Sequence, residues 1–317
     1  MLLAGCTRQS PKERITLYSG RSPHLLQPLL DRFSEETGIE VQVRYGGTAE
    51  MAATILEEGP RSPADIFFAQ DAGALGALAV AGVFRPLPPD IVNLVDARFR
   101  SPDNLWVGIS GRARVIAYNT DTVSPDQLPT SIDDLSDPRW RDRIGWAPLN
   151  ASFQAFVTAL RVERGEDEAR QWLMGVAANR PRVYARNTAI LNAVAAGEVD
   201  LGLVNHYYLH TMQAERGGGL PVANHTPPAG TLVNVAGAGI LRTTTRFTAA
   251  RQLLAYLLSE PAQRYFSDET FEYPLASGVP ASPLLPDLVE IPVPSIDLNR
   301  LEDLEGTLRL LQELGIL

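Results

Sequence analysis

Apolar residues follow two patterns along this chain. Runs in which every second residue is apolar predict strands, and runs with apolar residues three and four positions apart predict helices with one buried face. A strand over residues 14–18 is followed by a helix whose apolar stripe spans 25–33, and strand–helix units continue to about residue 80. Strands that alternate with helices predict a largely parallel sheet covered by helices. We therefore expect an α/β fold.

Two longer β runs interrupt this alternation. One covers residues 106–119, and the other, 232–235, follows a Gly- and Pro-rich stretch. A second strand–helix set lies between the two runs. We therefore predict two α/β lobes that are joined by two β-strand hinges and enclose a cleft. The expected bounds are 1–12 for a signal remnant and linker, 13–111 with 236–290 for lobe 1, 112–235 for lobe 2, and 291–317 for an amphipathic helical tail.

The predicted strand 201–204 leads directly into Asn205-His206-Tyr207-Tyr208. Neighbouring side chains of a regular strand point to opposite faces, so both tyrosines serve one pocket only if the backbone bends here. Ligands of parallel sheets gather at the carboxyl ends of the strands, where residues 18–21 and 69–70 also fall. These turns predict a single cleft. Taken alone, an adjacent tyrosine pair is more often packed on the core than used as a ligand.

Composition narrows the functional classes. The chain has 317 residues, 45% of them hydrophobic, and a formal charge of −9, which argues against nucleic acid as a partner because no basic patch offsets phosphate repulsion. A P-loop, a nucleophile elbow and an HExxH pattern are all missing from the sequence. We therefore expect a binding protein and not an enzyme.

Cysteine occurs once, at Cys6 in Leu3-Ala4-Gly5-Cys6. The run resembles the lipobox of bacterial lipoproteins, in which the cysteine carries lipid. That resemblance implies a protein of the periplasm or the outer face of the cytoplasmic membrane, anchored through Cys6. The alternative is an ordinary N-terminus with one free thiol. A lone cysteine also excludes an intramolecular disulfide framework and a thiolate metal cluster.

Six short motifs occur in the order seen in ferric-iron-binding proteins of bacterial ABC importers, which this chain resembles from about residue 15 to its C-terminus. They are Tyr18-Ser19-Gly20-Arg21, Pro63-Ala64-Asp65-Ile66-Phe67-Phe68, Ser110-Gly111-Arg112-Ala113-Arg114-Val115, Ile144-Gly145-Trp146, Asn205-His206-Tyr207-Tyr208 and Glu272-Tyr273-Pro274-Leu275. The resemblance implies the type II periplasmic-binding-protein fold, a monomer, and an ABC transporter permease and ATPase as partners.

The same resemblance implies a ferric site. Tyr207 and Tyr208 match the paired tyrosine ligands, while Ser22, Gln70 and Asn150 stand where relatives have a histidine, a carboxylate and a third tyrosine. Carbonate or phosphate would complete the shell as synergistic anion. The positions that match anion contacts are Arg21, Arg112, Asn150, Ala151, Ser152, Asn187 and Asn205. Gln70, His206 and Ser22 are expected to support the ligands, Ser152 to cap the helix that follows it, and Arg114 to form an ion pair between the lobes.

The implied ligands suit the metal. Fe³⁺ is hard and prefers anionic oxygen, which phenolate supplies. Two phenolates leave one positive charge, which an anion offsets. Two alternatives remain open from the sequence. One is a clamshell binding protein for another ligand (an oxyanion, a polyamine or an iron chelate), and the other is an enzyme on the same fold.

Overall fold

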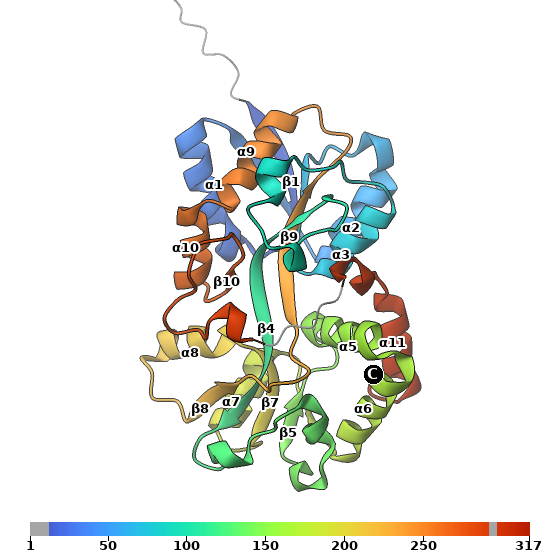
Figure 1. Ribbon diagram of the computed structural model, residues 1–317, viewed down its shortest axis with the longest axis vertical. Coiled ribbons are helices and arrows are strands. Elements are labelled where there is room, and N and C mark those ends of the chain that lie inside the picture. The colour runs from blue at the N-terminus through green and yellow to red at the C-terminus, as the bar shows by residue number, and fades with distance from the viewer. Residues whose placement is uncertain (1–12, 292–296) are drawn as a thin grey trace, which may run out of the picture.

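The computed structural model describes residues 13–291 and 297–317 (Figure 1). The lipobox-like Cys6 therefore lies outside the described residues, as does the expected linker 1–12. No helix in the described ranges is long and apolar enough to span a membrane.

One mixed sheet runs through the molecule, with strand order β2-β1-β3-β9-β4-β7-β5-β6, and β8 and β10 also pair with β4. Its strands are β1 (Arg14–Ser19), β2 (Glu40–Tyr45), β3 (Ile66–Ala69), β4 (Val107–Asn119), β5 (Ile144–Trp146), β6 (Arg182–Val183), β7 (Leu201–Asn205), β8 (Val222–His225), β9 (Val233–Ile240) and β10 (Tyr273–Pro274). β1 pairs in parallel with β2 and β3, and β5 pairs in parallel with β6 and β7. The parallel sets predicted from strand–helix alternation are therefore present in both halves.

Helices cover both halves of the sheet (Figure 1). They are α1 (Pro23–Thr37), α2 (Thr48–Glu58), α3 (Ala72–Val80), α4 (Pro89–Val92), α5 (Ala151–Arg164), α6 (Glu166–Ala178), α7 (Asn187–Ala195), α8 (Tyr207–Arg216), α9 (Phe247–Leu257), α10 (Glu260–Asp268) and α11 (Leu304–Glu313). The short 3₁₀ helix η7 (Leu298–Glu302) precedes α11 and packs on α3.

Two long antiparallel strands, β4 and β9, connect the lobes at the waist (Figure 1). The first half of β4 pairs with β9, and its second half, from Arg114 to Tyr118, pairs with β7. β4 is buried along nearly its whole length, which explains its continuous apolar pattern. The expected two-lobed fold with β-strand hinges is confirmed.

The C-terminal segment makes a third connection, and its first part packs on α3. The carbonyl oxygens of Asn299 and Leu301 lie so close to α3 that a Cβ at Gly76 would be 2.3 Å from the first and one at Gly73 2.5 Å from the second. Trp106 Nε1 donates a hydrogen bond of 2.7 Å to Asn299 Oδ1. Glycine at these two helical positions therefore allows η7 to contact the helix backbone directly.

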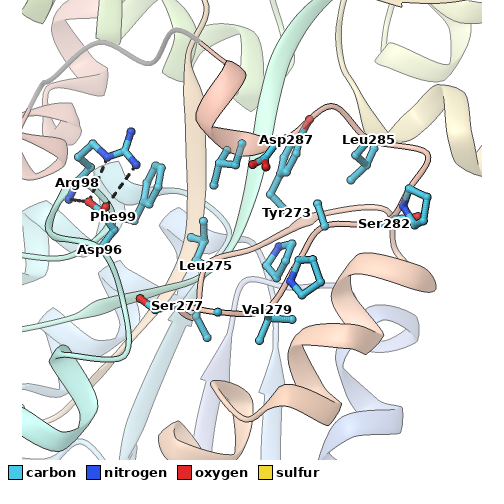
Figure 2. A pocket seen from close by; sticks show the side chains of 17 residues that line it. Asp96, Arg98, Phe99, Tyr273, Leu275, Ser277, Val279, Ser282, Leu285 and Asp287 are labelled. Atoms are coloured by element: carbon cyan, nitrogen blue, oxygen red, sulfur yellow. Dashed lines mark hydrogen bonds and ion pairs between the residues drawn. The ribbon is translucent and has the colours of Figure 1, made fainter.

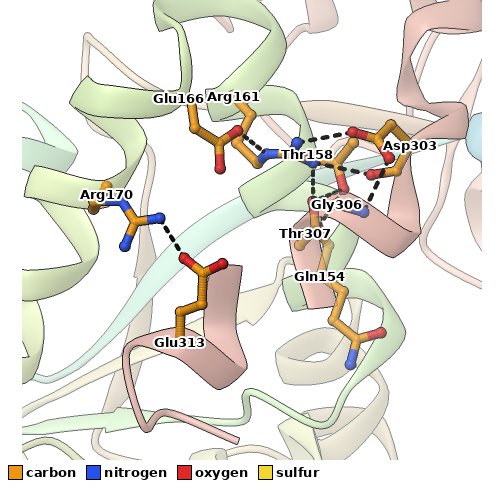
Figure 3. Close-up of polar contacts among 9 residues, drawn as sticks. All are labelled: Gln154, Thr158, Arg161, Glu166, Arg170, Asp303, Gly306, Thr307 and Glu313. Carbon is orange, nitrogen blue, oxygen red and sulfur yellow. Dashed lines mark hydrogen bonds and ion pairs between the residues drawn. The ribbon is translucent and has the colours of Figure 1, made fainter. Parts of the chain in front are cut away.

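The second part of this segment, α11, packs on α5 (Figure 3). Thr158 and Thr307 share a buried hydrogen bond of 2.7 Å between their hydroxyls. Arg161 donates to Asp303 Oδ2 at 2.8 Å and to the Thr307 hydroxyl at 3.0 Å. The segment thus holds α3 at one end and α5 at the other.

The expected cap of α5 was wrong, and one strand is very short. β6 is only an exposed edge of two residues, because the chain turns at once into α7. Helix α5 is capped by Asn150, whose Oδ1 accepts from the Ser152 amide at 3.0 Å, and not by Ser152. Ser22 occupies the N-cap position of α1, but its side chain makes no capping hydrogen bond.

Candidate metal and anion site

A cleft of about 650 Å³ lies between the lobes and contains the tyrosine pair. Lobe 1 contributes the start of α1, the end of β3 and α10, while lobe 2 contributes α7 and α8. The lining side chains include Arg21, Ser22, His24, Gln70, Thr188, Tyr207, Tyr208, Thr211 and Tyr265. The turns expected to meet at one cleft therefore do meet.

The backbone bends at His206, as a shared tyrosine pocket requires. β7 ends at Asn205, His206 is already in the helical region, with φ −56° and ψ −41°, and α8 begins at Tyr207. The rings of Tyr207 and Tyr208 stack with centroids 4.2 Å apart and planes 29° apart. Both are partly buried and line the same cleft. The two phenols can therefore act together on one ligand.

His206 faces away from the cleft. Its Nδ1 accepts a hydrogen bond of 3.1 Å from the Ala113 amide, and its ring stacks on Tyr273 with centroids 4.7 Å apart. Burial lowers the pKa of His206 to about 3, so the imidazole is neutral. His206 therefore fixes the bend between β7 and α8 against the hinge strand β4.

The phenol of Tyr207 is held protonated. Burial raises its pKa, the neighbouring Tyr208 and Glu272 raise it further, and Arg112 acts in the opposite direction. A cation bound here must displace that proton, so binding strengthens as the pH rises.

Arg114 lies at the centre of a polar cluster in lobe 2. Its Nη1 donates to Ser152 Oγ at 3.3 Å, and to Asn187 Oδ1 and Asn205 Oδ1 at 3.4 Å each. Asn187 in turn donates to Ser152 Oγ at 3.3 Å. This cluster stands at the N-terminus of α5, where the helix dipole favours an anion, and the Ser152 amide is already bonded to the Asn150 cap.

The charge of Arg114 has no carboxylate partner among the described residues, so the expected interlobe ion pair is wrong. The guanidinium is 4% exposed and lies 5.7 Å from the ring centroid of Phe153. Burial lowers its pKa to about 9, and the groups that oppose this are the phenols Tyr208 and Tyr207. A buried cation of this kind favours an anionic ligand.

Arg21 is bonded to a carboxylate of the protein itself. Its Nη2 lies 2.7 Å from Glu272 Oε1, and both side chains are 1% exposed. The second carboxylate oxygen of Glu272 accepts from the Ser110 hydroxyl of β4. Arg21 therefore lines the cleft with its charge already matched.

Arg112 has different hydrogen-bond and charge partners from Arg114, although it lies only two positions away on β4. Its Nη2 donates to the carbonyl oxygen of Gln70, at the end of β3. Its charge acts on Asp71, Glu272 and Tyr207. The buried side chain of Arg112 thus contacts lobe 1 at Gln70, which itself lines the cleft.

The structure brings several of the predicted anion positions together: Ser152, Asn187 and Asn205 bond to Arg114. Asn150 bonds to Ser152, and Ala151 is the first residue of α5 between them. Ser22 and Gln70 line the cleft at the start of α1 and the end of β3. Arg114 and Glu272 were not among the predicted site residues. A signal was present for each, since both are charged residues inside otherwise apolar buried runs.

A second cavity, of about 440 Å³, lies beside β10 (Figure 2). Prolines and aliphatic side chains between residues 274 and 285 form much of its wall, and Asp96 and Arg98 bond to each other there.

In the part of the chain that the structure describes, no group of three or more His, Cys, Asp or Glu side chains could hold a metal. The tyrosine pair in the cleft between the lobes remains the candidate metal site.

Comparisons with known proteins identify the family of this chain. The family described as bacterial extracellular solute-binding protein matches residues 61–301. The chain is 32% identical to the major ferric iron-binding protein of Neisseria meningitidis, over 100% of this chain and 97% of that protein. It is 38% identical to iron uptake protein A2 of Synechocystis, over 88% of this chain and 83% of that protein.

Two solved structures share the fold. Iron-bound HitA from Pseudomonas aeruginosa superposes with a TM-score of 0.86 at 34% identity, covering 96% of this chain and 99% of that chain. FutA (IdiA) from Trichodesmium, in complex with iron and citrate, gives a TM-score of 0.82 at 31% identity, with coverage of 95% and 99%.

Proposed function

The chain belongs to the bacterial extracellular solute-binding proteins of the ferric iron-binding type, and from this premise we propose that it captures ferric iron with a synergistic anion. Members of this group bind a ligand and do not catalyse its conversion, so the protein is not an enzyme. The observation that carries the proposal is the proximity of a stacked phenol pair to a buried guanidinium that lacks a carboxylate.

Tyr207 and Tyr208 hold the iron in this proposal. Each phenolate supplies an anionic oxygen, which a hard cation prefers, and the stacked rings present both hydroxyls to one cleft. Iron displaces the phenolic protons, so each bound phenolate makes the affinity more dependent on pH.

The anion binds at Arg114. Two phenolates offset two of the three charges of Fe³⁺. The Arg114 cluster offers a guanidinium whose Nε makes no hydrogen bond within the described residues, together with a hydroxyl and two side-chain amides, beside the N-terminus of α5. Carbonate and phosphate both match this donor set. The anion then bridges the metal and lobe 2, and it offsets the charges of both Fe³⁺ and Arg114.

Titration of the unliganded protein with ferric iron tests the proposal. We expect a visible phenolate-to-iron charge-transfer band in the presence of bicarbonate or phosphate, and its loss in Tyr207→Phe/Tyr208→Phe. Tyr256→Phe serves as the control, because Tyr256 lies on α9 and packs on Phe33, away from the cleft. An undiminished band in the double variant would refute the assignment of the ligands.

The same titration separates free iron from a chelate. One of the similar structures contains iron and citrate. If the band forms with citrate but with neither carbonate nor phosphate, the ligand is a ferric chelate and the synergistic-anion proposal is wrong.

Delivery to an ABC transporter permease and its ATPase completes the proposed role, with the protein acting as a monomer outside the cytoplasm. The run Leu3-Ala4-Gly5-Cys6 supports a lipid anchor at Cys6, outside the described residues. We expect Cys6→Ser to move the protein from the membrane to the soluble fraction of cells. Unchanged membrane association would contradict the anchor.

A further inference from the structure

One buried arginine, Arg21, lines the cleft, and two more, Arg112 and Arg114, interact electrostatically with the cleft tyrosines, but the three charges are matched differently. Arg21 follows β1, and Arg112 and Arg114 lie on β4. All three guanidinium groups are buried, with residue exposures of 2%, 2% and 4%. Each could attract an anion from solution, so their internal partners decide how many anions the site admits.

Glu272 forms a buried ion pair with Arg21. One carboxylate oxygen bonds Arg21 Nη2 at 2.7 Å, and the other accepts from the Ser110 hydroxyl. Neither side chain of the ion pair is accessible to solvent, at 1% exposure each. An exogenous anion could reach this guanidinium only by displacing Glu272.

Glu272 stays ionised in this position. Burial alone raises the pKa of its carboxyl, but the charges of Arg21 and Arg112 and the hydrogen bonds from Ser110 and Arg21 together lower the pKa below its usual value. A carboxylate held charged inside the protein is the chemical equivalent of a bound anion.

We propose that Glu272 is a built-in anion that fills the Arg21 subsite and restricts the cleft to one exogenous anion per iron, bound at Arg114. The inference rests on the proposed function. It assigns to Arg21 a role different from the direct anion contact that the family resemblance implied. It also makes Glu272 a residue that determines specificity, because its charge decides whether lobe 1 can bind an oxyanion.

Anion stoichiometry tests the inference. Protein loaded with iron and ¹³C-bicarbonate is acidified, and the released CO₂ is counted against iron. We expect one carbonate per iron in the wild type and two in Glu272→Gln, which keeps the shape but frees Arg21. Asp268→Asn is the control, since it removes one negative charge from the exposed end of α10 and should leave the ratio at one.

A second set of variants remains informative if Glu272→Gln folds poorly. We expect Arg21→Gln to keep one carbonate per iron, and Arg114→Gln to lose it. The double variant Arg21→Gln/Glu272→Gln removes both charges of the ion pair, so it should also bind one. A ratio below one in Arg21→Gln, or a ratio of one in folded Glu272→Gln, would overturn the inference.

These outcomes are separate from the proposed function. If wild-type protein shows neither a charge-transfer band nor a bound anion, the proposed function fails. If the wild type binds iron with one anion and the Arg21 and Glu272 variants do not behave as stated, only the role of Glu272 is wrong.

Discussion

At the scale of single residues, the electrostatic surroundings of an arginine depend less on its position along a strand than on the side chains that the fold places beside it. Arg112 and Arg114 share one side of β4 because side chains two positions apart point the same way. Yet Arg112 contacts the loop after β3, while Arg114 contacts side chains from α5, α7 and β7. The first guanidinium therefore has carboxylates nearby, and the second has none among the described residues.

The unmatched charge of Arg114 predicts that anions stabilise the protein even without iron. A ligand present at a hundred times its dissociation constant raises the unfolding free energy by about 2.7 kcal/mol. We expect bicarbonate or phosphate to raise the melting temperature of the iron-free wild type, but not of Arg114→Gln. Arg251→Gln, which removes an exposed ion pair with Asp90, should respond as the wild type does. An equal shift in Arg114→Gln would place the anion elsewhere.

The Arg21–Glu272 pair predicts a pH dependence of stability. The pKa of Glu272 is lower in the folded protein than its ordinary value of about 4.3. Its contribution to stability is therefore complete above that ordinary pKa and is lost as the pH falls through the folded value. Between pH 5 and pH 3, urea unfolding should show a larger loss for the wild type than for Glu272→Gln. Equal losses would show that Glu272 does not titrate as an ion-paired group.

The sequence allowed the tyrosine pair to be predicted but not the charge network around it. Tyr207 and Tyr208 are adjacent and end a recognisable apolar run, so a local pattern identifies them. Glu272 meets Arg21 only because β10 pairs with β4 next to the turn after β1. Contacts between residues this far apart in the sequence depend on the completed fold, and periodicity carries no signal for them.

At the scale of elements, apolar periodicity predicted the helices and long strands well, because one buried face is a local property. It failed for η7, whose packing depends on backbone contact. On helix propensity alone, the two glycines Gly73 and Gly76 are expected to destabilise α3. The reason for these glycines appears only when the carbonyls of Leu301 and Asn299 are seen against the helix.

This contact predicts the sign of a substitution. Helix propensity favours Gly76→Ala by about 1 kcal/mol. In the folded protein, however, the new Cβ would lie 2.3 Å from the Asn299 carbonyl oxygen, so η7 must shift. We expect a net loss of about 1–3 kcal/mol in urea unfolding, typical of overpacking. In protein that lacks residues 297–317 the same substitution should stop being destabilising. A gain in the full-length protein would contradict the tight packing of η7.

At the scale of the whole molecule, the connections between the lobes in the described residues include β4, β9 and the C-terminal segment (Figure 1). Two neighbouring strands alone permit both bending and twisting. A third connection, displaced toward α3 and α5, permits mainly the rotation whose axis passes near all three. Closure of the cleft is therefore expected to be a hinge motion with little twist.

Removal of the Arg161 bonds tests this restraint (Figure 3). Arg161→Met keeps the aliphatic stem but loses the contacts with Asp303 and Thr307. We expect a larger radius of gyration for the iron-free protein in solution scattering, an unchanged value with iron, and iron affinity about tenfold weaker, equivalent to 1.4 kcal/mol. Arg170→Met removes only the exposed pair with Glu313 and should change neither. Identical scattering from Arg161→Met and the wild type would contradict the restraint.

The strand order also decides when each lobe can fold as the chain is made. β3 is fully buried between β1 and β9, and β9 comes from residues 233–240. Until that segment has been synthesised, Ile66–Ala69 forms an apolar sheet edge with no neighbour on one side, which is a template for aggregation. Most of lobe 2 is continuous in sequence and can fold first. The time needed to make residues 70–232 therefore sets how long the edge of lobe 1 stays open to chaperones or to other chains.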